Sequence, residues 1–161
     1  DFVRDKDGNA SAVMFAELAA YAMSEGTSIA GLRDRIWGEY GVHMEEGKSL
    51  VMEGGEGARK IAALVKSYSV DPPAIVDGSD AIAVRDYERG GFYDQEGDEL
   101  PAASMLFVDL ADGRRFAVRP SGTEPKIKYY LFGKGENKDG VQKSLDALWL
   151  ALEKDAYQRM T

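Results

Sequence analysis

Residues 116–132 read FAVRPSGTEPKIKYYLF, two apolar runs on either side of a loop rich in hydrogen-bond donors. Within the loop, Arg119 offers a planar fork of donors that matches phosphate oxygens, and Ser121 and Thr123 add hydroxyl groups. Gly122 lets backbone N–H groups converge on an anion without interference from a Cβ. A plain surface turn would also be rich in Pro, Ser and Gly, but the order of the residues after Gly122 favours a phosphate-binding loop between two strands.

The composition restricts the partners that the chain can have. Its 161 residues include 20 Lys and Arg against 28 Asp and Glu, which gives a formal net charge of −8. Such a chain lacks a broad positive surface, so neither nucleic acid nor an anionic membrane is expected as a partner. A phosphorylated ligand then needs local positive charge, which Arg119, Lys126 and Lys128 can supply. The chain has no cysteine, which excludes disulfides and fits a reducing cytoplasm.

Hydrophobic periodicity predicts the order of the helices and strands. Helices are expected at residues 9–24, 29–40 and 139–159, and the glycines at 54–57 lead into a further helix that residues 71–73 break. Strands are expected at residues 42–52, 81–87, 105–110, 115–119 and 126–132, with a short strand inside the acidic segment 88–101. Asp112 and Gly113 signal a two-residue hairpin turn. The pattern predicts an α+β fold from residue 42 onward, an antiparallel sheet covered on one face by two helices.

The string RPSGTEPK at residues 119–126 closely resembles the phosphate-binding loop in the C-terminal domain of the alpha-D-phosphohexomutases. The continuation IKYY at residues 127–130 resembles the phosphoglucomutase and phosphomannomutase branches, whereas phosphoglucosamine mutases usually continue with an Arg-Val pattern. The segment RDKDG at residues 4–8 also resembles a family segment near the end of the preceding domain. The resemblance implies that residues 1–41 are the last helices of an α/β sugar-recognition domain and that residues 42–161 form the phosphate-binding domain.

The resemblance also implies a function. The alpha-D-phosphohexomutases interconvert sugar 1-phosphates and 6-phosphates through a phosphoserine and a sugar bisphosphate. In these enzymes an Asp-rich loop of another domain holds Mg²⁺. The present chain carries neither the serine motif nor a complete magnesium loop, and it starts with Asp1. We therefore expect a C-terminal piece of such an enzyme, with no catalytic or metal-binding residue of its own, inactive alone and dependent on the N-terminal domains of the same polypeptide.

The site residues that the resemblance implies are Arg119, Ser121, Gly122 and Thr123, with Lys126 adding positive charge. They would hold the phosphate of the sugar substrate that is not being transferred, while the domain closes over the cleft about a hinge near residue 42. Two alternatives remain open at this stage. One is a phosphoglucosamine mutase or phosphopentomutase of the same family, and the other is a stand-alone anion-binding module without enzymatic activity.

The remaining candidate residues do not complete a metal-binding or catalytic motif. Asp5 and Asp7 do not complete a metal loop, so they are expected to cap the first helix, while Lys6 is a candidate substrate contact by the resemblance. The glycines at 54–57 are expected to give flexibility and not an anion site. His43 has no evident catalytic partner, and Glu124 is expected to orient Arg119 or a neighbouring backbone group.

Overall fold

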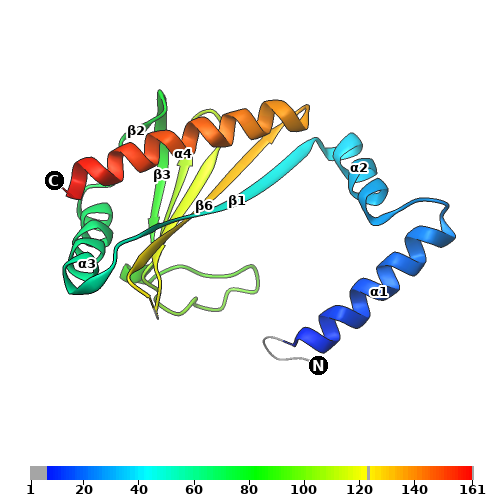
Figure 1. Ribbon diagram of the computed structural model, residues 1–161, viewed down its shortest axis with the longest axis horizontal. Helices are drawn as coiled ribbons and strands as arrows, with labels where there is room; N and C mark the ends of the chain where they lie inside the picture. Colours follow the sequence, from blue (N-terminus) through cyan, green and yellow to red (C-terminus); the bar gives the residue numbers. More distant parts are fainter. Residues whose placement is uncertain (1–6, 123, 161) are drawn as a thin grey trace. The chain divides into compact units, whose positions relative to one another are not determined.

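The computed structural model describes residues 7–122 and 124–160 of the chain, which divides into two compact units, residues 1–42 and 43–161. The first unit holds the helices α1 (Gly8–Ser24) and α2 (Ile29–Tyr40). The elements that follow are β1 (Val42–Val51), α3 (Gly54–Val70), β2 (Ile75–Val76), β3 (Ser79–Asp86), the short 3₁₀ helix η1 (Tyr87–Arg89), β4 (Leu106–Leu110), β5 (Arg115–Pro120), β6 (Lys126–Gly135) and α4 (Lys138–Met160) (Figure 1). Within the described residues, no helix combines the length and apolar character needed to cross a membrane.

The two helices of the first unit begin at capping side chains. The carboxylate of Asp7 accepts hydrogen bonds from the backbone N–H groups of Asn9 and Ala10, at 2.8 and 3.0 Å, so the capping role expected for Asp7 is confirmed. Ser28 caps α2 in the same way. Asp5 and Lys6 lie outside the described residues. Much of the apolar surface of this unit is exposed, on Val13, Met14, Phe15, Leu18, Tyr21, Met23, Ile36 and Tyr40.

The second unit is built on a six-stranded sheet in the order β1-β6-β5-β4-β3-β2. The strands β2 to β6 pair antiparallel, each with the next along the chain. Short connections join β2 to β3, β4 to β5 and β5 to β6, as antiparallel neighbours allow, whereas residues 87–105 join β3 to β4. In Figure 1, α4 runs across the sheet, and α3 lies near the C-terminal end of α4. The fold is the predicted α+β architecture.

Alternation along β6 separates the covered face of the sheet from the open one. Ile127, Tyr129 and Leu131 are fully buried. They pack beneath the apolar stripe of α4, which consists of Val141, Leu145, Leu148, Leu152 and Ala156. Burying one large aliphatic side chain contributes about 1.5–3 kcal/mol, so this interface supplies much of the stability of the unit. The intervening residues of β6 point to the open face.

The centre of the core contains a buried tyrosine pair. The hydroxyls of Tyr68 in α3 and Tyr129 in β6 lie 3.2 Å apart, and the edge of Trp149 packs against Tyr129. Burial raises the pKa of Tyr129 to about 12 and also raises the pKa of Tyr68 above its ordinary value.

This pair predicts a loss of stability at alkaline pH. Above pH about 10 an unfolded tyrosine releases its proton while the folded pair keeps both, so the free energy of unfolding falls as pH rises from about 10 towards 12. Urea unfolding at pH values on either side of this range measures the slope. The double variant Tyr68→Phe/Tyr129→Phe is expected to flatten it, whereas Tyr157→Phe, at an exposed site, is expected to leave it unchanged. An equal slope in the double variant and the wild type would contradict the assignment.

The β4–β5 hairpin forms as predicted, but its turn is longer than two residues. The N–H of Gly113 donates to the carbonyl of Leu110 at 3.0 Å, and the N–H of Leu110 donates to the carbonyl of Arg114 at 2.9 Å. Three residues therefore form the turn, with Gly113 at φ +87°, a conformation that favours glycine. The turn is held by Arg114, which is buried and contacts Asp77 and Asp112 at 2.7 and 2.6 Å.

The prediction of a short strand inside residues 88–101 is wrong. Only a single bridge, between Tyr93 and Glu99, forms there. The Asp94 side chain accepts the N–H groups of Glu96 and Asp98 at 3.0 and 2.8 Å, so the side chain offers the backbone an alternative to a strand ladder. The two-residue strand β2 was not predicted, because so short a run has no readable period.

Candidate phosphate-binding site

The loop of residues 121–125 joins the two neighbouring strands β5 and β6. Arg119 lies directly opposite Lys128, and Pro120 lies opposite Ile127. The N–H of Ser121 donates to the carbonyl of Lys126 at 2.9 Å, and the N–H of Lys126 donates to the carbonyl of Glu124 at 2.7 Å. These bonds close the loop and occupy the backbone N–H of Ser121. The hydroxyl of Ser121 is a separate donor that a ligand can use. Thr123 lies outside the described residues.

The junction of β1 and α3 supports the loop from one side. The N–H of Met52 donates to the carbonyl of Pro125 at 3.1 Å. Gly57, in the first turn of α3, is buried against Met52, where an added Cβ would lie 2.3 Å from the Met52 carbonyl oxygen. A hollow of about 480 Å³ separates α3 from the loop, lined by Gly54, Ala58, Ile61, Ala62, Pro120, Ser121, Gly122, Glu124 and Pro125. The flexibility predicted for the glycines thus does not account for Gly57, which permits close packing.

The charges of the loop are arranged differently from the prediction. Glu124 forms an ion pair with Lys126, which also lowers the pKa of Glu124. It was expected to orient Arg119 or a backbone group. Arg119 is exposed and forms no ion pair with any other described residue. Its guanidinium is therefore available to an external anion, whereas the charge of Lys126 is already balanced.

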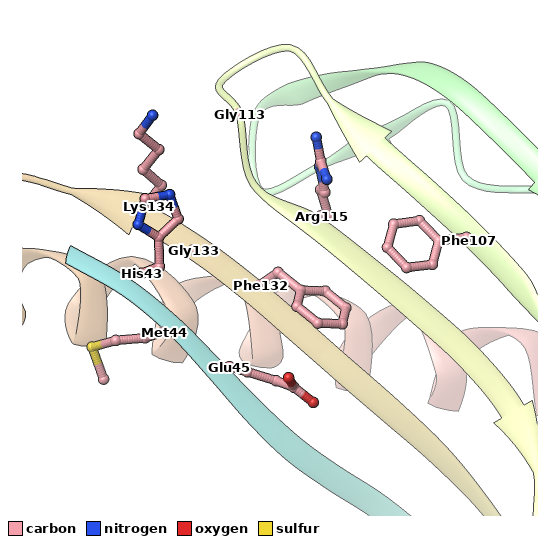
Figure 2. Close-up of a pocket in the computed structure, with 9 residues that line it drawn as sticks. All are labelled: His43, Met44, Glu45, Phe107, Gly113, Arg115, Phe132, Gly133 and Lys134. Carbon is pink, nitrogen blue, oxygen red and sulfur yellow. The ribbon is translucent and has the colours of Figure 1, made fainter. Parts of the chain in front are cut away.

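A second hollow, of about 600 Å³, lies on the open face of the sheet near the beginning of β5. Its lining consists of His43, Met44, Glu45, Phe107, Gly113, Arg115, Phe132, Gly133 and Lys134. Figure 2 shows His43 and Lys134 together on one side, across from Arg115 and Phe107. The rings of Phe107 and Phe132 stack with their centroids 5.6 Å apart.

The electrostatics of the two hollows differ. Beside the larger one, Arg115 lies 3.1 Å from Asp109, and the lining contains both a carboxylate, Glu45, and a cation, Lys134. The loop and its flanking strands carry three cations, Arg119, Lys126 and Lys128, and one carboxylate, that of Glu124. An anion needs uncompensated positive charge, so the face of the loop that carries Arg119 is the better candidate site, and not the hollow beside α3, whose one charged lining residue is Glu124.

The described residues offer no magnesium site. Nowhere in ranges 7–122 and 124–160 do three or more His, Asp or Glu side chains gather as metal ligands would. Magnesium, which the phosphohexomutase resemblance implies for another domain of the parent enzyme, therefore does not fit the residues described here.

Known proteins resemble the chain in sequence and in fold. The sequence model of the phosphoglucomutase/phosphomannomutase C-terminal domain matches residues 50–139. A phosphoglucomutase from Staphylococcus haemolyticus is 32% identical over 150 residues, which is 90% of this chain and 27% of that protein. A phosphoglucomutase from Staphylococcus aureus is 32% identical over 152 residues, 91% of this chain and 27% of that protein. The chain thus spans about a quarter of the length of these curated relatives.

A solved structure shares the fold. The open form of pp63/parafusin, a Paramecium phosphoglucomutase, superimposes with a TM-score of 0.60 and 18% identity, covering 98% of this chain and 28% of that one. The family match includes the whole loop with Arg119, together with all of α3 and the strands β2 to β6. The chain therefore belongs to the phosphoglucomutase/phosphomannomutase family and contains its C-terminal domain.

Proposed function

We propose that this chain is the part of a phosphohexomutase that binds the non-transferred phosphate of the sugar substrate and closes the active site. The observation that carries the proposal is Arg119, an exposed arginine without an ion-pair partner among the described residues, at the edge of the RPSGTEPK loop. A guanidinium can donate two parallel hydrogen bonds to phosphate oxygens, which fixes both the position and the orientation of the group.

The other loop residues complete the proposed site. The hydroxyls of Ser121 and Thr123 and the N–H of Gly122 supply neutral donors, and Lys126 contributes through the local potential only, because Glu124 balances its charge. Such donors recognise a phosphate whichever sugar carries it. A loop of this kind therefore suits a reaction in which either end of a sugar bisphosphate occupies the same site.

The proposed parent enzyme interconverts a sugar 1-phosphate and 6-phosphate through a phosphoserine and a bisphosphate intermediate. In it, Mg²⁺ and the serine belong to domains other than this one, and closure about the Val42 region excludes water from the cleft. The exposed apolar side chains of α1 and α2 support the proposal that residues 1–41 complete a neighbouring domain, since such surface is normally covered. Lys6 as a substrate contact and a cytoplasmic location both remain predictions.

Glucose phosphates are the first substrates to test, because the relatives named above are phosphoglucomutases. Phosphoglucosamine mutase and phosphopentomutase are the alternatives within the family. A stand-alone anion-binding module is the alternative outside it. Sequencing the gene upstream of Asp1 separates them, since only a mutase would encode the serine and magnesium motifs there.

The 161-residue chain is expected to bind phosphate without catalysing a reaction. Inorganic phosphate and glucose 1-phosphate should each raise its Tm relative to chloride at equal ionic strength, by preferential binding to the folded state. A coupled assay for glucose 6-phosphate should detect no turnover, because the phosphoryl donor is missing. Turnover by the purified chain would refute the proposal that catalysis needs the other domains. The absence of a Tm rise with either ligand would refute the phosphate site.

A further inference from the structure

Most of the outer edge of β3 has no neighbouring strand among the described residues. Only the two residues of β2 pair with it, opposite the first two residues of β3. The N–H of Ala81, the next residue, donates to the carbonyl of Ala74 at 2.8 Å. Residues 82–86 then follow with no strand on that side, so they form an edge that can accept another strand.

The strand register shows which backbone groups of this edge point outward. The N–H of Leu110 donates across the β4–β5 hairpin, so the backbone groups of Leu110 point to β5. Alternation turns those of its neighbour Asp109 towards β3, where Asp109 pairs with Ala83. The N–H and C=O groups on either side of Ala83, those of Ile82 and Val84, therefore point away from the sheet.

The side chains along this edge are apolar and exposed. Ile82 and Val84 have 67% and 41% of their surface exposed, and Val70 at the end of α3 has 73%. Val84 lines a hollow of about 500 Å³ together with Val70 and Phe92. An exposed strand edge with β-branched apolar side chains favours pairing with a further strand, and the hollow beside it has room for a side chain of that strand.

The charged side chains of the edge have partners within the same copy. Arg85 contacts Asp109 at 2.8 Å, and Asp86 accepts a hydrogen bond from Arg89 at 3.1 Å and another from Ser69. A strand that docks here does not have to supply a counter-charge. The occupant that fits best is therefore an uncharged apolar strand, and the sequence AIAV at residues 81–84 of β3 is itself such a strand.

We propose that a second copy of this chain docks on the edge, so that the two β3 strands pair antiparallel about a two-fold axis at Ala83. In this register Ile82 of each copy lies opposite Val84 of the other, and the outward backbone groups of the two residues form hydrogen bonds. Directly opposite side chains share a face of the sheet, so Ile82 enters the hollow beside Val84 and Val70 of the other copy. Because the contact uses the same edge of both copies, association stops at a dimer.

The dimer is expected to be reversible. The register shift between Ala81 and Ala83 bends β3 and limits the shared ladder to a few residues. We expect a dissociation constant of about 10–100 µM, because so short a contact lies at the low end of interface size. This inference concerns association and does not depend on the proposed phosphate site.

Analytical ultracentrifugation of the 161-residue chain, at concentrations on both sides of this range, tests the dimer. Ile82→Lys and Val84→Lys should each weaken dimerisation at least about tenfold, because a two-fold contact loses each apolar side chain twice. Both side chains are exposed in the single copy, so the Tm should change little. The matched controls are Val51→Lys on β1, at the opposite edge of the sheet, and Met14→Lys on α1, which replace side chains that are 62% and 64% exposed. Both controls should dimerise like the wild type.

The variant Ala83→Cys tests the register. The chain has no cysteine, so the new thiol can form a disulfide only with a second copy. In the proposed dimer the two Cα atoms lie about 4.5 Å apart, the spacing of an antiparallel pair without hydrogen bonds between its residues and within the range of a disulfide. Mild oxidation should therefore cross-link Ala83→Cys and leave Val51→Cys largely as single chains.

Three results would overturn this inference. The first is a wild-type chain that stays monomeric over the whole range of concentrations. The second is a dimer that Val51→Lys or Met14→Lys abolishes while Ile82→Lys and Val84→Lys do not, since the contact would then involve β1 or the apolar surface of α1. The third is a chain that dimerises but whose Ala83→Cys variant does not cross-link, which would exclude the two-fold register.

Discussion

Replacing Gly57 by alanine is expected to lower the free energy of unfolding by about 2 kcal/mol. The new methyl group would lie 2.3 Å from the carbonyl oxygen and 2.5 Å from the carbonyl carbon of Met52. Overpacking costs about 1–3 kcal/mol or more, here at the upper end because a backbone must move, and the better helix propensity of alanine offsets about 1 kcal/mol. Urea unfolding at neutral pH measures the difference.

Gly55 provides the control within the same helix. An added Cβ at Gly55 would meet no atom within 4 Å. Gly55→Ala is therefore expected to be neutral or to stabilise the chain by up to about 1 kcal/mol. Equal stability of the two variants would show that Gly57 is not needed for close packing. Because Met52 also holds the carbonyl of Pro125, Gly57→Ala should weaken phosphate binding as well, whereas Gly55→Ala should not.

The second large effect is expected at Arg119. In a full-length phosphoglucomutase that contains this domain, Arg119→Ala should reduce kcat/KM roughly 30- to 900-fold. This reduction corresponds to a loss of about 2–4 kcal/mol of transition-state stabilisation. The loss follows from the removal of the main charged contact to a phosphate that is held throughout the reaction. Arg119→Lys should recover only part of the activity, because the ammonium keeps the charge but lacks the planar fork.

Steady-state kinetics with glucose 1-phosphate measure this effect. Arg59→Ala is a suitable control, since Arg59 is an exposed arginine on α3. It should leave kcat/KM within about twofold of the wild type, because Arg59 does not line the hollow beside the loop and an exposed surface charge contributes little in physiological salt. A wild-type kcat/KM for Arg119→Ala would remove that residue from the site.

Much of the fold was predictable because the apolar residues keep a clear period. The helices α1 and α2 and the strands β1 and β6 begin within a residue or two of their predicted starts. The segment 88–101 was one exception, because hydrogen bonds to the Asp94 side chain replace a strand ladder there. Such local competition depends on geometry, which residue spacing does not encode.

The roles of single charges were less predictable. Lys126 was expected to add positive charge for the phosphate, and Glu124 was expected to orient Arg119 or a neighbouring backbone group, yet the two side chains form an ion pair with each other. Lys128 was predicted only as a general source of positive charge, and the strand register places it directly opposite Arg119. The one available signal was the alternation of β6, which puts Lys126 and Lys128 on the same face but does not say which one has a carboxylate partner.

The sequence by itself determined the α+β class and the position of the loop between β5 and β6, because periodicity and the string RPSGTEPK are local properties of the chain. The tertiary structure alone decided which cations of the loop are left unbalanced and why Gly57 has no side chain. Both depend on residues that are distant in sequence and meet only after folding: β5 against β6 for Arg119 and Lys128, and α3 against the end of β1 for Gly57. Strand register and close packing are set by the whole fold, so they cannot be read from a single segment.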